Sequence, residues 1–361
     1  LNWSRHFRCF PGQGDMPLLD FMSAVAATGY QGDLSLEIFN DQFRAGSPRS
    51  VAVDGQRSLV YLMDQLRAKS GKPVADVPQM PPRSKCLGVE FIEFAVDDRT
   101  AQELEQFIAG LGFRNVARHK SKAVSRWTQG SINLVINKEK EGFAHSHYIT
   151  HGASVCAIGL KVESAAATLD RAEKLHDTPF RQKVGPGELE IPAVRGMGGS
   201  LLYFLDPTSK LGKVWDVEFE PVAGGKGADA GLTVVDHISQ STHYEDMLSW
   251  LLFYTSLLDV QKTPQVDIND PGGVVRSQVV ETADGTLRIA LNASQSTRTQ
   301  SSRFLNEYFG SGVQHIAFAT DDILATAARL RANGVETLRI PENYYDDLEA
   351  QGNPAAISID V

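Results

Sequence analysis

The sequence predicts an α/β block followed by a larger α+β region that is built from repeated βαβββ modules. Three observations favour this organisation. Helix, strand and helix patterns alternate over residues 18–71, as in the βα units of a parallel sheet. A proline-rich segment follows over residues 71–85. Beyond it, strand–helix patterns that begin near residue 88 recur about 144 residues later, near residue 232.

The composition is that of a globular protein with a sizeable core. Of the 361 residues, 42% are hydrophobic and 22% are charged, and the formal net charge is −9. This acidic balance argues against a general nucleic-acid or anionic-membrane binder, because phosphate contacts need clustered Lys and Arg. The sequence contains no run of 18 apolar residues, so it predicts no membrane span. Three widely spaced cysteines (Cys9, Cys86 and Cys156) fit neither a zinc pair nor a disulfide framework, and they favour a reducing, cytoplasmic setting.

The N-terminal block, residues 1–72, holds one and a half βα units. The hydrophobic pattern predicts a helix over Leu18–Tyr30, a short apolar strand over Asp33–Phe39 and a second helix over residues 50–71. Because so few elements cannot close a core, we expect the rest of this domain to lie upstream of Leu1. Prolines make residues 73–86 an extended linker.

The remainder of the chain repeats itself. The strand–helix pattern of Gly88–Phe113 returns in Leu232–Val260, and that of Val155–Leu175 returns in Val313–Gly334. These repeats predict four βαβββ-type modules, which pair into two halves that span residues 87–225 and 226–361. A module of one helix and one curled sheet forms a half-barrel, so a pair of modules encloses a cup.

Local signals support the predicted elements of this repeat. Asp321 before the last helix and Gly334 after it are residue types that cap helices. Asp284-Gly285, between two alternating strands, predicts a tight hairpin.

Two histidines occupy corresponding strands of the second half, whereas the first half has apolar residues at both places. His237 matches Phe91, and His315 matches Ala157. Two neutral imidazoles and one carboxylate leave positions open for a chelating substrate and dioxygen, as non-haem Fe(II) oxygenases need. The pair therefore predicts a metal site in the second half and a metal-free first half. The alternative is that both are strand histidines satisfied by neighbouring polar groups.

The motifs VDHI, VRSQVV, RIALN, GVQHIAFATDDI and PENYYDDLEA, in this order, resemble the 4-hydroxyphenylpyruvate dioxygenases of the vicinal-oxygen-chelate superfamily. The resemblance covers roughly residues 87–350. It implies Fe(II) held by two His and one Glu, with a 2-oxo acid chelated through its keto and carboxylate oxygens. By this resemblance, the metal ligands would be His237 and His315, and the substrate-pocket residues would be Ser277, Asn292 and Gln300.

The chain departs from that family at two points. Ala293-Ser294 follow Asn292 where the family has Glu-Pro, which leaves the specificity of the pocket open. The family's ligand Glu comes later than this chain extends, so we expect the third ligand beyond Val361; Asp360 is the only strand-like carboxylate near the end. We therefore expect an incomplete iron site and an inactive chain as it stands. The alternative function is a non-catalytic module that binds a small acid or forms dimers.

A second resemblance covers residues 1–70. SRHFRCFPGQGD and GYQGDLSLEIFNDQFRA resemble the last βα units of the sugar phosphate isomerase/epimerase TIM barrels, most closely bacterial 3-dehydroshikimate dehydratases, which occur fused ahead of hydroxyphenylpyruvate-dioxygenase-like domains. The resemblance implies loss of water from 3-dehydroshikimate to give protocatechuate. Glu37 matches the last ligand of a divalent metal, and its hard oxygens suit Mg²⁺ or Mn²⁺. Arg8 could hold the substrate carboxylate, and His6 is a catalytic candidate; the alternative for both is a place in a solvated loop. For Glu37 the alternative is a salt bridge at the end of a strand.

Three further histidines, His145, His147 and His151, have loose metal-like spacing, and we expect them on the surface in a polar loop. The predicted protein is thus part of a cytoplasmic bifunctional enzyme, a lyase and an oxidoreductase. Its expected partners are small acids, dioxygen and further copies of itself.

Overall fold

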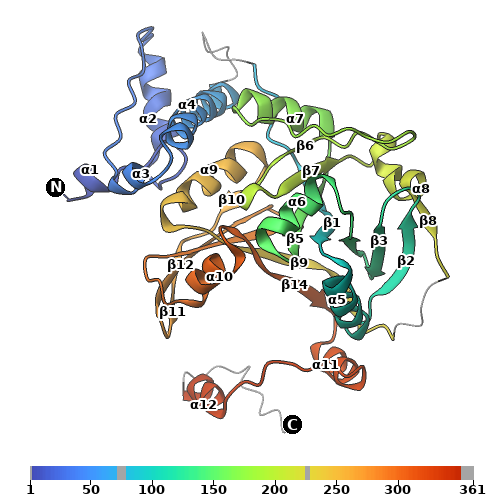
Figure 1. Ribbon diagram of the computed structural model, residues 1–361. Helices are drawn as coiled ribbons and strands as arrows, with labels where there is room; N and C mark the ends of the chain where they lie inside the picture. Colours follow the sequence, from blue (N-terminus) through green and yellow to red (C-terminus); the bar gives the residue numbers. More distant parts are fainter. Residues whose placement is uncertain (1, 71–78, 224–227, 351–361) are drawn as a thin grey trace.

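Two mixed sheets form the body of the protein, and four N-terminal helices pack on one side of it (Figure 1). The computed structural model describes residues 2–70, 79–223 and 228–350. Within these ranges, no helix is long and apolar enough to cross a lipid bilayer.

The N-terminal block is helical. Its helices are α1 (Asn2–His6), α2 (Leu18–Ala27), α3 (Asp41–Ala45) and α4 (Pro48–Ser70). The two predicted helices are confirmed, whereas the strand predicted over Asp33–Phe39 is wrong. Only its last residue, Phe39, takes part in pairing: its carbonyl accepts from the Arg8 amide at 3.0 Å, next to an isolated bridge between Phe7 and Asn40. No neighbouring strand lies beside the segment among the described residues. Part of the predicted linker, residues 71–78, lies outside the described residues.

The first sheet has eight strands in the order β6-β7-β5-β1-β4-β3-β2-β8. The strands are β1 (Cys86–Ala95), β2 (Arg114–His119), β3 (Val124–Gln129), β4 (Ile132–Asn137), β5 (Ser154–Val162), β6 (Ala193–Arg195), β7 (Leu201–Leu205) and β8 (Phe219–Pro221). The accompanying helices are α5 (Asp98–Gly110), α6 (Gly142–His151), α7 (Ala165–Lys174), η1 (Met197–Gly199), η2 (Lys210–Lys213) and α8 (Val214–Glu218).

The second sheet follows the order β10-β12-β13-β9-β14, and β11 pairs with β12. Its strands are β9 (Leu232–Ser241), β10 (Gln261–Lys262), β11 (Val266–Asp270), β12 (Gly273–Glu281), β13 (Arg288–Ser294) and β14 (Gly312–Thr320). Its helices are η3 (Tyr244–Asp246), α9 (Met247–Leu257), α10 (Gln300–Tyr308), α11 (Ile323–Ala332) and α12 (Glu342–Ala350).

The predicted repeat is present, but four full modules is too many. Both sheets are centred on one strand that runs parallel to one neighbour and antiparallel to the other: β1 between β4 and β5, and β9 between β13 and β14. A fourth module is represented by β14 and α11 within the described residues. The hairpin at Asp284-Gly285 is confirmed, since Gly285 adopts a φ of 72° between β12 and β13. Asp322, one residue after the predicted Asp321, caps α11 by accepting from the Ala325 amide.

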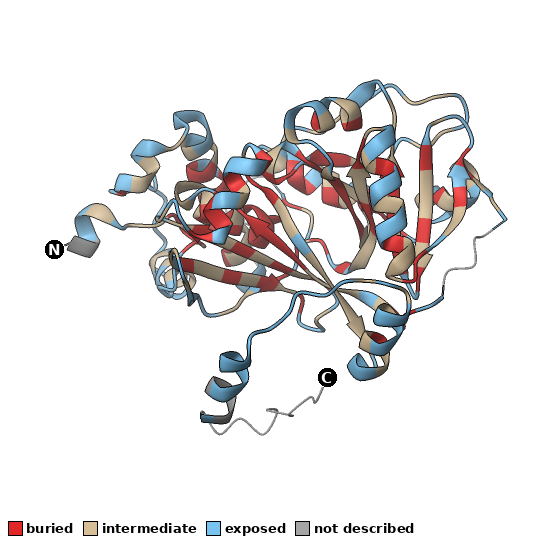
Figure 2. Ribbon diagram, turned by 60° about the horizontal axis from the view of Figure 1, so that its bottom comes forward, coloured by how far each residue is buried: buried red, intermediate tan, exposed pale blue. Residues whose placement is uncertain are grey.

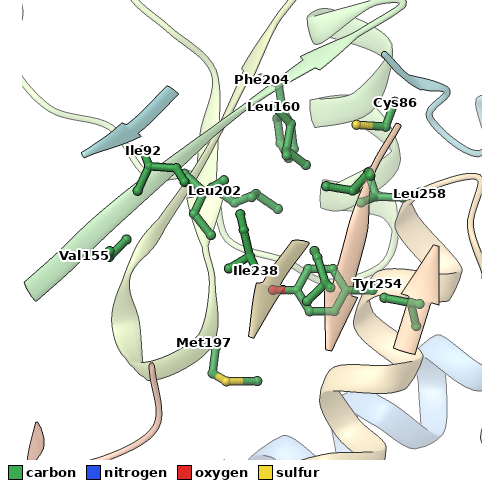
Figure 3. Close-up of a cluster of buried hydrophobic side chains, with 14 of the residues drawn as sticks. Cys86, Ile92, Val155, Leu160, Met197, Leu202, Phe204, Ile238, Tyr254 and Leu258 are labelled. Atoms are coloured by element: carbon green, nitrogen blue, oxygen red, sulfur yellow. The ribbon is translucent and has the colours of Figure 1, made fainter. Parts of the chain in front are cut away.

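The main core lies between the two sheets and α9 (Figure 2). Ile238 of the second sheet packs among side chains of the first, including Leu202 and Met197, as Figure 3 shows. The backbones approach so closely that a Cβ on Gly198 would lie 1.8 Å from the Ser311 carbonyl oxygen. The two sheets therefore form one packed body whose register depends on small residues at the contact.

The N-terminal block is tied to this body through α4. Helix α4 packs against α9, and Arg57 of α4 forms an ion pair of 2.6 Å with Asp177. Both side chains are almost fully buried. Helix packing and a buried ion pair thus hold the block against the body together.

Candidate metal centre

The two predicted metal ligands come from neighbouring strands of the second sheet. His237 lies on β9 and His315 on β14, and their ring centroids are 5.5 Å apart with the planes at 81°. With metal–nitrogen bonds of about 2.1 Å, two imidazoles that share one ion at roughly 90–110° would place their centroids about 4.6–5.3 Å apart. The observed separation is therefore compatible with one shared ion after a small adjustment.

The residue before each histidine fixes the orientation of its ring. Asp236 accepts a hydrogen bond from Nδ1 of His237 at 2.7 Å, and the Gln314 amide oxygen accepts one from Nδ1 of His315 at 2.7 Å. Arg288 in turn donates to the other Asp236 oxygen at 2.9 Å. Because each Nδ1 donates, each Nε2 carries the lone pair that a metal needs.

The surroundings of His315 favour its neutral form. Burial lowers the pKa of His315, and the nearby His237 lowers it further. The lower pKa favours the neutral ring, which is the form that ligates a metal.

Two of the three predicted substrate residues lie in the same sheet, on the first and second strands beyond β9. Ser277 on β12 and Asn292 on β13 are direct cross-strand neighbours. The Asn292 amide donates to the hydroxyl of Ser239 at 2.8 Å, and Ser239 is the strand partner of His315. A polar row thus runs from β12 across the sheet to the metal-facing strand.

The third predicted substrate residue, Gln300, begins α10. Its backbone amide donates to Asp270 at 3.0 Å, and its side chain is exposed. Helix α10 approaches the sheet at Ser301, whose hydroxyl bonds that of Ser241 at 3.1 Å. The exposed side chain of Gln300 thus does not join the row formed by Ser277 and Asn292.

The described residues contain no cluster of three or more His, Cys, Asp or Glu side chains arranged to hold a metal. Asp360, the weak candidate from the sequence, lies outside those residues. The donor set of His237 and His315 suits a borderline ion such as Fe(II), with at least one further ligand to be supplied from elsewhere.

Sequence reasoning missed Asp236, Gln314 and Ser239. A signal was available for the first two, because VDHI and VQHI each place a hydrogen-bonding side chain directly before the histidine. Ser239 gave no such signal, since only the strand register brings it to Asn292 and His315.

The strand registers confirm the predicted correspondence of the two halves. Ile92 pairs with Ile158 and Leu134 in the first sheet, as Ile238 pairs with Ile316 and Ile289 in the second. Counting from these pairs, Phe91 corresponds to His237, and Ala157 corresponds to His315. The same count makes Glu93 the counterpart of Ser239 and Asn137 that of Asn292.

The three residues predicted for the barrel site lie at the surface of the N-terminal block. Arg8 donates to the Glu37 carbonyl at 3.2 Å, and its Nη1 lies 3.7 Å from the Glu37 carboxylate, which is 72% exposed. His6 instead bonds Asp41 at 2.7 Å. Arg8 and Glu37 are thus neighbours, whereas His6 belongs to a separate ion pair.

The prediction that His147 and His151 lie on the surface in a polar loop is wrong. Both belong to α6 and face α10 across the boundary between the two halves. His147 is 5% exposed and its Nε2 lies 3.0 Å from the Tyr308 hydroxyl, while the ring of His151 stacks on Tyr308. These rings are packed as part of the interface, for which the local sequence gives no periodic signal. His145, on the same helix, is partly exposed.

The chain is similar to several known proteins. Residues 83–220 match the family model "Hydroxyphenylpyruvate dioxygenase, HPPD, N-terminal", and residues 235–350 match "Glyoxalase/Bleomycin resistance protein/Dioxygenase superfamily". A 4-hydroxyphenylpyruvate dioxygenase of Pseudomonas aeruginosa is 34% identical over 267 residues, which cover 73% of this chain and 74% of that protein. The chain belongs to the 4-hydroxyphenylpyruvate dioxygenase family.

The match also extends through the N-terminal block. A 3-dehydroshikimate dehydratase of Pseudomonas putida is 44% identical over 356 residues, 97% of this chain and 56% of that protein. A solved structure described as a xylose isomerase-like TIM barrel/4-hydroxyphenylpyruvate dioxygenase fusion protein matches with a TM-score of 0.84 and 43% identity, over 98% of this chain and 57% of that one. The chain therefore spans just over half the length of these relatives, and the similarity supports a fusion of the two kinds of domain.

Proposed function

We propose that this chain is part of a bifunctional enzyme. Residues 87–350 form an Fe(II)-dependent unit that acts on 4-hydroxyphenylpyruvate or a similar 2-oxo acid with dioxygen. Residues 1–72 belong to a barrel that dehydrates 3-dehydroshikimate to protocatechuate with Mg²⁺ or Mn²⁺. The observation that carries the first assignment is the pair His237 and His315, each oriented through its Nδ1 by the preceding side chain.

In this proposal His237 and His315 hold the ion. Bound there, Fe(II) supplies open coordination positions for the two oxygens of a 2-oxo acid and for dioxygen. Asp236 and Gln314 keep each Nδ1 protonated, so the rings cannot rotate away from the ion without losing a hydrogen bond. Ser277 and Asn292 would orient the organic part of the substrate from the adjacent strands.

An anaerobic calorimetric titration with Fe(II) tests the metal assignment, because it measures the dissociation constant of the ion. We expect His237→Ala and His315→Ala each to weaken Fe(II) binding at least tenfold. His145→Ala, on helix α6 and outside this cup, is the control and should leave the affinity unchanged. Equal affinity of the wild type and His315→Ala would remove His315 as a ligand.

The alternative function, a non-catalytic module that binds a small acid or forms dimers, is favoured by one observation. Within residues 2–70, 79–223 and 228–350, no third metal-ligating side chain joins the two histidines. Oxygen consumption by the full-length protein separates the two functions. Multiple turnovers with 4-hydroxyphenylpyruvate and Fe(II) support the oxygenase, and saturable binding without consumption of oxygen supports the module.

For the barrel, Glu37 would ligate the divalent ion and Arg8 would bind the substrate carboxylate, in keeping with their proximity. His6 is the weaker catalytic candidate because Asp41 already occupies its Nδ1. The test is formation of protocatechuate from 3-dehydroshikimate by the full-length protein. Glu37→Ala should abolish turnover, and unchanged turnover would refute the role.

A further inference from the structure

The first sheet also encloses a cup, of about 870 Å³ including its open mouth. Its walls come from β1, β4 and β7, from α8 and from the segment of residues 180–191. Nothing in the proposed oxygenase or dehydratase function uses this cavity. Its lining combines several aromatic rings with charged side chains, which is the composition of a ligand site rather than of a packing defect.

Aromatic rings fill the corner of this cup that corresponds to the metal corner of the second half. Phe91, the counterpart of His237, packs against Tyr203 at 5.9 Å and edge-on against Trp215 at 6.0 Å between ring centroids. Gly159 makes room for this ring, because a Cβ there would lie 2.4 Å from it. The corner therefore offers an apolar surface and no metal ligand.

The floor of the cup carries a carboxylate without a counter-charge. Glu93 accepts a hydrogen bond from the Asn137 amide at 2.7 Å, as Ser239 does from Asn292 in the second half. Among the described residues, no Lys, Arg or His forms an ion pair with Glu93. Burial raises the pKa of Glu93, although the hydrogen bond from Asn137 and the nearby Lys122 oppose that effect. A positive ligand would relieve the cost of this buried charge.

The other buried carboxylates of the cup already have hydrogen-bond donors from side chains. Lys122 donates to Glu188 at 2.8 Å, and Glu218 lies 3.3 Å from Nε2 of His119. Backbone amides of Ser121 and Lys122 donate to Nδ1 of His119, so its Nε2 carries the proton and the ring is neutral. Four carboxylates and two basic groups line the cup, which leaves two negative charges in excess; they are Glu93, Glu188, Glu190 and Glu218 against Lys122 and Arg181.

We propose that this first-half cup binds a small organic cation, a primary ammonium on an apolar or aromatic body. The ammonium group pairs with Glu93 and Asn137 on the floor. The apolar body lies against Phe91 and Tyr203, whose rings also favour a nearby positive charge. An anion of the same size would meet the excess of carboxylates and find the nearest lysine already held by Glu188.

Three probes of one shape test the proposal on the whole 361-residue chain. Benzylamine, benzyl alcohol and benzoate differ in charge but share one ring, and calorimetry gives the dissociation constant of each. We expect benzylamine to bind at least tenfold more tightly than the other two. Benzoate binding as tightly as benzylamine, or no detectable binding of benzylamine, would overturn the proposal without any need for a variant.

A variant locates the bound amine. Glu93→Gln keeps the acceptor for Asn137 and the shape of the side chain but removes the charge, so the fold should survive. We expect this variant to bind benzylamine at least tenfold more weakly than the wild type does. Glu103→Gln, an exposed carboxylate on α5, is the matched control and should bind as the wild type does. Full affinity in Glu93→Gln would mean that the amine binds elsewhere, the second-half cup included, and would exclude the first-half cup.

Discussion

The contact that most directly joins the N-terminal block to the rest of the chain is the guanidinium of Arg171. This side chain on α7 has 0% exposed surface. Its Nε donates to the Ser256 carbonyl of α9 at 2.7 Å, and its Nη1 donates to Asp64 of α4 at 3.0 Å and to the Pro81 carbonyl. One cation thus satisfies acceptors from three separate segments.

Replacing Arg171 by Met keeps much of the apolar stem but orphans these acceptors. A buried acceptor that loses its partner costs about 1–3 kcal/mol. The two carbonyls bear that cost, whereas Asp64, 20% exposed, can turn partly to water. Removing the buried charge offsets part of this loss, because the folded state no longer bears the cost of desolvating Arg171, whose Nη2 has no partner. We therefore expect Arg171→Met to lower the free energy of unfolding by about 3 kcal/mol.

Urea denaturation followed by circular dichroism and tryptophan fluorescence measures this loss. Lys174→Met is the matched control, since Lys174 lies on the same helix and forms an exposed ion pair with Asp170, worth at most about 0.5 kcal/mol. If both variants unfold at the same urea concentration, the contacts of Arg171 do not stabilise the junction of the three segments.

Two further predictions concern the boundary between the halves. Burial, with a smaller contribution from His151, lowers the pKa of His147 to about 4 from an ordinary value of 6.5, so the unfolded chain takes up this proton first as the pH falls. We expect the stability that depends on neutral His147, about 2–3 kcal/mol, to be complete above pH 6.5 and to decline between pH 6.5 and 4. Urea midpoints across this range should fall less steeply in His147→Gln than in the wild type, and parallel slopes would contradict the assignment. Gly198→Ala should lower the free energy of unfolding by about 3 kcal/mol or more, because its Cβ would overlap Ser311. Gly187→Ala is the control: this glycine also has a positive φ but open space around it, so the loss should be only about 1 kcal/mol in the same urea measurement.

The sequence predicted the repeat and its register because both depend on local periodicity. Alternating strands, the Asp284-Gly285 turn and the two matched histidines each leave a short-range signal. The strand predicted over Asp33–Phe39 failed for the opposite reason, since an apolar segment becomes a strand only where a partner offers hydrogen bonds. The prediction that His147 lies on the surface failed for a similar reason, because its partner Tyr308 is 161 residues away along the chain.

Glu93 shows most clearly what a single sequence cannot reveal. A glutamate in the middle of a strand reads as an exposed residue on the polar face of a sheet. Only the register, which places it opposite Ala157 and within reach of Asn137, turns it into the floor of a cavity. Its functional meaning comes from what is missing around it, namely a counter-charge, and no motif records that.

The two halves share a pattern of strands but differ in the chemistry of their side chains, and strand geometry explains how this is possible. Successive side chains of β1 and β9 point to opposite faces, so Ile92 and Ile238, 1% and 0% exposed, pack into the common core. The residues on either side of them point away from that core. What can stand there also depends on the neighbouring strand, because Gly159 makes room for Phe91, whereas the strand partner of His237 is Ala317. In such a fold, packing of the core constrains one face of each central strand. The other face can differ between the halves, as the proposed metal site of one half and the proposed amine site of the other require.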